Sequence, residues 1–67
     1  SDPMVGLTTG TRVAVRTRID PIPAHGPTLT DTVGELTALD EHGLRIATRS
    51  GEVALRRDLV VAALGLA

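Results

Sequence analysis

The sequence predicts an all-β protein, and three features of the 67-residue chain support this prediction. Five short segments are rich in Val, Leu, Ile and Thr, and most of them alternate between apolar and polar residues, as half-buried strands do. A long Pro-rich segment separates the first of these from the second. The connections from the second segment to the third and from the third to the fourth are short and contain Gly. We therefore expect the second, third and fourth strands to form an antiparallel meander.

The first predicted strand covers residues 11–18. Val13 and Val15 fall on one face of it. Three basic residues share the other face: Arg12, Arg16 and Arg18. Residues 20–27 then contain three prolines and a glycine. Because Pro cannot donate a ladder hydrogen bond and biases the preceding residue away from helix, we expect a long loop here.

The second predicted strand is the longest and covers residues 29–39. Gly34 inside it indicates a bulge or a strong bend, where a small sheet curls on itself. Residues 40–43 are typical of a tight turn, in which we expect Gly43 to supply a positive φ.

The third predicted strand covers residues 44–48, with every second residue from Leu44 onward on one face. A short turn ending in Gly leads to the fourth strand, residues 52–55, in which we expect Val53 and Leu55 to point inward.

The C-terminal segment allows two interpretations. We favour one helical turn over residues 57–59, followed by a last strand over 60–64. The alternative is a helix over 58–64 with Asp58 as N-cap, which the β-branched pair Val60 and Val61 disfavours.

Together the elements predict a small five-stranded SH3-like barrel, with a long Pro-rich loop after strand 1 and a helical turn before the last strand. An Sm-like or OB-like barrel is the alternative. An OB fold usually needs a longer chain and a helix between its third and fourth strands.

Length and composition predict one domain with a small core. We assign the domain to residues 4–67 and interpret residues 1–3, before Met4, as left by an expression vector. At this size the core rarely supplies more than about 3–5 kcal/mol, and the absence of Cys excludes disulfides. Seven basic residues balance eight acidic ones, which is a weak electrostatic basis for binding nucleic acid. No membrane span or signal peptide is recognised, so we expect a cytoplasmic protein without membrane contact.

The chain contains no Phe, Tyr or Trp, and all its basic residues are Arg. This composition suits a GC-rich bacterial genome. Small barrels commonly use aromatic rings to bind Pro-rich peptides, methylated lysines or nucleic-acid bases. The composition therefore argues against all three uses.

No residue set predicts catalysis, a cofactor or a metal. His25 and His42 lack converging partners and are expected to be exposed turn residues. A candidate interaction surface is formed by the basic residues Arg12, Arg16, Arg18, Arg56 and Arg57. The simpler interpretation is a solvated face whose arginines pair across strands with acids such as Glu35, Glu52 and Asp58.

Four blocks of the sequence resemble a known small domain. They are Val5-Gly6-x-x-x-Gly10-x-Arg12-Val13-x-Val15-Arg16, Thr30-Asp31-x-Val33-Gly34-Glu35-Leu36, Gly51-Glu52-Val53 and Arg57-x-x-Val60-Val61-Ala62-Ala63. This frame resembles the N-terminal SH3-like domain of actinobacterial GNAT-family acetyltransferases. The resemblance implies that a following domain binds acetyl-CoA and that the full-length protein is an N-acetyltransferase. The Arg/Gln-x-x-Gly-x-Gly/Ala motif of that domain is absent here, so no CoA-binding residue is assigned.

Two functional hypotheses follow. The first is a non-catalytic accessory or interaction domain that packs against an acetyltransferase domain of the same polypeptide. The second is a small nucleic-acid-binding barrel that uses the Arg-rich face. Homo-oligomerisation through an exposed strand edge is a further expectation, because small barrels can pair edge to edge.

Overall fold

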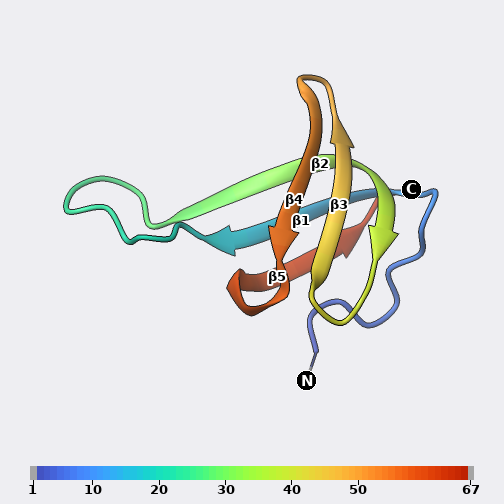
Figure 1. Cartoon of the computed structure of the whole chain (residues 1–67), viewed down its shortest axis with the longest axis horizontal. Coiled ribbons are helices and arrows are strands. Elements are labelled where there is room, and N and C mark those ends of the chain that lie inside the picture. Colours follow the sequence, from blue (N-terminus) through green and yellow to red (C-terminus); the bar gives the residue numbers. More distant parts are fainter. Residues whose placement is uncertain (1, 67) are drawn as a thin grey trace.

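The computed structural model describes residues 2–66, and its regular secondary structure is strand apart from one short 3-10 helix (Figure 1). In chain order the elements are β1 (Arg12–Arg18), β2 (Leu29–Leu39), β3 (Gly43–Thr48), β4 (Gly51–Arg56), the 3-10 helix η1 (Arg57–Leu59) and β5 (Val60–Gly65). The all-β prediction is confirmed. The alternative of a C-terminal helix is wrong, because residues after η1 pair with β1 as a strand.

The strands form one antiparallel sheet in the order β4-β3-β2-β1-β5. The first part of β2, up to Glu35, pairs with β1, and the part from Glu35 onward pairs with β3. The sheet therefore turns along β2, and the β3–β4 hairpin crosses over β1 and β5 (Figure 1). Such a curled sheet is compatible with a small SH3-like or Sm-like barrel.

Gly34 lies where β2 bends toward β3. A Cβ atom built on Gly34 would lie 2.2 Å from the backbone oxygen of Ala47 and 2.9 Å from a methyl carbon of Ile46. Only a residue without a side chain lets the two backbones approach this closely. The predicted bend is confirmed, while the β-bulge lies further along β2, at Thr37 between Leu36 and Ala38.

The core lies inside the curled sheet and is entirely aliphatic apart from one Met. Val13 and Val15 of β1 are fully buried, as the alternation predicts. Within residues 2–66, the buried apolar residues are Met4, Val13, Val15, Leu36, Leu44, Ile46 and Val60. Val53 shares the inner face with its cross-strand partner Ile46 but stays 36% exposed, because β4 is an edge strand.

The turn between β2 and β3 differs from the prediction. Gly43 is not among the glycines with positive φ and instead begins β3. The Asp40 side chain closes the turn, since its Oδ1 accepts hydrogen bonds from the backbone N–H groups of His42 at 2.8 Å and Gly43 at 3.0 Å. Gly43 is needed for space, because a Cβ there would lie 2.1 Å from the Leu55 oxygen.

The connection between β1 and β2 is the long loop that the prolines predict. The backbone N–H of Ile19 donates to the Thr28 oxygen at 2.9 Å, and beyond this bond the loop projects away from the sheet (Figure 1). Ile22 in the loop is 70% exposed, and His25 is exposed. The loop thus contributes little to the core.

Replacing Gly34 with Ala should destabilise the domain by about 1–3 kcal/mol, because the new methyl group meets backbone that cannot move alone. Gly65→Ala is the matched control, since a Cβ at this strand position meets nothing within 4 Å. Urea unfolding of both variants checks the prediction. Equal stability of the two variants would show that the close approach at Gly34 does not constrain the fold.

Candidate interaction surface

The structure distributes the five predicted surface arginines over three places. Arg12, Arg16 and Arg18 lie along the outer face of β1, at alternate positions to the buried valines. Arg56 ends β4, and Arg57 begins η1. Arg18 and Arg56 meet at one aspartate, whereas the other three lie apart and have different neighbours.

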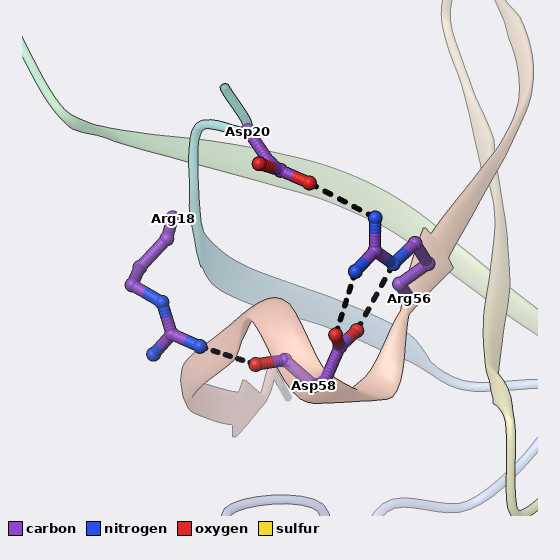
Figure 2. Close-up of polar contacts among 4 residues, drawn as sticks. All are labelled: Arg18, Asp20, Arg56 and Asp58. Atoms are coloured by element: carbon purple, nitrogen blue, oxygen red, sulfur yellow. Dashed lines mark hydrogen bonds and ion pairs between the residues drawn. The ribbon is translucent and has the colours of Figure 1, made fainter. Parts of the chain in front are cut away.

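Arg56 is the centre of a polar cluster (Figure 2). Its Nη2 and Nε bind the two carboxylate oxygens of Asp58 at 2.6 and 3.1 Å, and its Nη1 binds Asp20 at 3.0 Å. Arg18 donates to the backbone oxygen of Asp58. These contacts connect the end of β1, the start of the long loop, the end of β4 and η1. Hydrogen bonding to Arg56 holds the pKa of Asp58 below its ordinary value.

Arg16 forms a second polar pair in the middle of the sheet. It faces Asp31 in the β1–β2 register, with Nε to Oδ1 at 2.8 Å and Nη2 to Oδ2 at 3.0 Å. This two-pronged geometry is the one that guanidinium and carboxylate groups favour. The hydrogen bonds from Arg16 lower the pKa of Asp31.

Arg57 attaches the N-terminal segment to the barrel. It contacts the carboxylate of Asp2 and donates to the Asp40 backbone oxygen at 3.0 Å. Asp2 also accepts the backbone N–H of Met4 at 3.0 Å, the main cause that lowers the pKa of this carboxyl. Asp2, which the sequence assigned to vector residues together with Ser1 and Pro3, is therefore in contact with the domain. Ser1 lies outside the described residues.

Most arginines of the candidate surface thus have acidic partners within the chain. Pairing was predicted with Glu35, Glu52 and Asp58. Asp58 does pair with Arg56, and Glu35 is the register partner of Arg12, but Glu52 binds Arg45 at 3.0 Å instead. Asp20 and Asp31 were missed as partners. For Asp31, counting the register of the β1–β2 pair from the start of the loop would have found the contact.

A second feature of the outer sheet face is an aliphatic hollow, which we call the β5 hollow. It is lined on this face by the cross-strand neighbours Ala14 and Leu64 and by the row Asp31–Arg16–Ala62, and Val33 lies beside it as the register partner of Ala14. The hollow has a volume of about 240 Å³ and forms because the alanines of β1 and β5 are shorter than their neighbours. Leu64 is 63% exposed and Val33 is 41% exposed. This hollow was not predicted from the sequence.

Another hollow, of about 260 Å³, lies on the outer side of the β2–β3–β4 part of the sheet. Its floor contains Ala38, Gly43 and Ala54, and Arg45 and Arg56 border it. Both arginines already bind carboxylates, Arg45 that of Glu52 and Arg56 those of Asp20 and Asp58. The hollow therefore offers no unsatisfied cationic group to an anion.

The histidines and carboxylates form no metal centre in the described part of the chain, residues 2–66, where no three of them come together. His42 lies 3.6 Å from Glu41, and both side chains are more than four-fifths exposed. Over the same residues, no helix has the length and apolar character needed to cross a membrane.

A family model described as the Rv0428c N-terminal Sm-like domain matches residues 7–63. The match covers all of β1 to β4 and most of β5. It agrees with the Sm-like alternative that the sequence left open beside the SH3-like barrel. No curated protein and no solved structure matches the chain.

The stability of the domain should fall on acidification. The pKa values of Asp31, Asp40 and Asp58 are lowered in the folded state. The ionised carboxylates therefore stabilise the fold at pH values above their unfolded pKa of about 3.9, and this stabilisation is lost as the pH falls through the lower folded pKa values. We expect a steady urea midpoint between about pH 7 and 5 and a decline below about pH 4.

The variant Asp31→Asn tests the origin of this decline. It should lower the urea midpoint at pH 7 and reduce the further loss below pH 4. Glu41→Gln is the control, because its partner is the exposed His42. An acid profile that is the same in wild type and Asp31→Asn would contradict the assignment to the Arg16–Asp31 pair.

Proposed function

The chain belongs to the family of the Rv0428c N-terminal Sm-like domain, and on this basis we propose that it is a non-catalytic accessory domain of a GNAT-type acetyltransferase. In this proposal the domain packs against an acetyltransferase domain of the same polypeptide. That domain binds acetyl-CoA and carries out the reaction, and the Sm-like domain supplies a protein contact surface.

The family description supports the first part of the proposal. It places the domain at the N-terminal end of the protein for which the family is named, so that in that protein more chain follows. The blocks that resemble the N-terminal domain of acetyltransferases include the Thr-Asp-x-Val-Gly-Glu-Leu segment of β2, which contains Asp31 and Gly34. These residues set the cross-strand pair and the bend, so the resemblance extends to residues that determine the fold.

One observation supports the proposal most strongly. The domain combines a small aliphatic core with exposed aliphatic side chains on the outer face of the sheet. Seven buried apolar residues form the core in the described part of the chain, while Leu64 and Val33 remain exposed. A chain of this size gains stability from burying such groups against another domain. The paired arginines leave the same surface without a large net charge, which suits contact with protein.

The alternative function, nucleic-acid binding through the Arg-rich face, has less support. Arg16, Arg56 and Arg57 have carboxylate partners, and Arg18 donates to a backbone oxygen. Phosphate binding would require breaking these contacts, and the chain has no Phe, Tyr or Trp ring on which a base could stack. We expect no salt-sensitive binding to short single-stranded or double-stranded DNA or RNA.

An NMR titration tests the proposed function. The isotope-labelled domain is titrated with the acetyltransferase domain encoded downstream in the same reading frame, and saturable shift changes confined to one surface are expected. An unrelated acetyltransferase domain serves as control. A reading frame without an acetyl-CoA-binding domain, or unchanged shifts at saturating concentration, would overturn the proposal.

A further inference from the structure

The most distinctive unassigned surface of the molecule is the β5 hollow. Cross-strand neighbours line it, with Ala14 next to Leu64 and Arg16 between Asp31 and Ala62, and Val33 lies beside it on the other side of Ala14. The alanines form a low floor, the exposed Leu64 forms a wall, and the Arg16–Asp31 pair forms a polar rim. A partner's aliphatic side chain fits such a hollow.

We infer that the β5 hollow is the docking site for the attached acetyltransferase domain, an inference that rests on the proposed function. The position of β5 supports this choice of occupant. β5 is an edge strand that lies beside β1 alone, and Leu64 is its second-last residue. Leu66, two residues after Leu64, still contacts β1, since its backbone N–H donates to the Arg12 oxygen at 2.8 Å, so the C-terminal end of the described chain lies close to the hollow.

The size of the hollow also favours a partner in the same polypeptide. A stable interface between separate proteins buries roughly 800 Å² on each partner, about a sixth of the 4576 Å² exposed by this chain. Leu64, the adjacent Val33 and the alanines of the hollow supply only part of such an area. A covalent link raises the effective concentration of the partner, so a small contact is enough to hold the two domains together.

The charges of the hollow indicate the chemistry of the partner surface. Arg16 and Asp31 bind each other through two hydrogen bonds, and each side chain is about half exposed. A charged group placed over this pair would compete with an existing contact. The partner surface should therefore present aliphatic side chains at its centre, with uncharged polar groups over the Arg16–Asp31 rim.

Paired surface variants test the docking site in the same titration with the downstream acetyltransferase domain. Leu64→Ser removes the large aliphatic side chain that lines the hollow, Val33→Ser removes the exposed one beside it, and their combination should weaken binding at least tenfold. Ile22→Ser and Val5→Ser are matched controls, because these side chains are 70% and 78% exposed elsewhere on the molecule. The controls should change the dissociation constant less than twofold.

A further variant keeps the test valid if Leu64→Ser unfolds the edge strand β5. Ala62→Gln fills the hollow from its exposed floor without adding a charge and should weaken binding similarly. Dispersed amide spectra and an unchanged urea midpoint establish that each variant is folded. Shift changes of the wild type should then centre on residues 12–16, 31–35 and 61–65.

The outcomes separate the two proposals. Wild-type binding that the hollow variants leave unchanged overturns the docking site and leaves the accessory function standing. Absence of wild-type binding overturns the accessory function, and the docking site with it. If the isolated domain self-associates and Leu64→Ser makes it monomeric in sedimentation analysis, the occupant is a second copy of the chain and the inference is wrong.

Discussion

The close approach of β3 to Gly34 is the constraint on which the rest of the structure depends. The Ala47 oxygen lies so near Gly34 that no side chain fits between the two strands. This contact lets one strand, β2, pair with β1 along one part and with β3 along the other. The inner faces of Val13 and Ile46 thereby come together in one core. Without any aromatic side chain, a flatter sheet would leave these small residues partly exposed.

The meander of β2, β3 and β4 was predictable, and so were the strand boundaries to within one residue, because alternation and turn residues are local signals. β2 begins and ends at the predicted residues, and η1 covers the predicted helical turn. Gly43 shows a limit of prediction from local sequence signals. A glycine in a turn predicts a positive φ, yet the structure needs Gly43 because the Leu55 backbone passes over it. Which strand passes over a residue is a property of the folded sheet, and the local sequence does not contain it.

Some contacts of the candidate surface were likewise predictable from the sequence, and others depend on the folded sheet. The Arg16–Asp31 pair follows from strand register and could have been counted from the sequence. The Arg56–Asp20 and Arg57–Asp2 contacts join residues 36 and 55 positions apart, and only the closing of the barrel brings them together. Arginines that looked like a ligand-binding face thus act largely within the molecule. The exposed aliphatic rows became visible only after β5 was placed beside β1.

The composition of β5 has a consequence for the behaviour of the isolated domain in solution. Its sequence, Val-Val-Ala-Ala-Leu-Gly, contains neither a charge nor a proline, although the strand lies at an edge of the sheet. The other edge strand, β4, carries Glu52 and Arg56, which discourage pairing with a further strand. An uncharged edge of six residues is a template for aggregation. An uncovered β5 should therefore limit the solubility of this domain at high concentration.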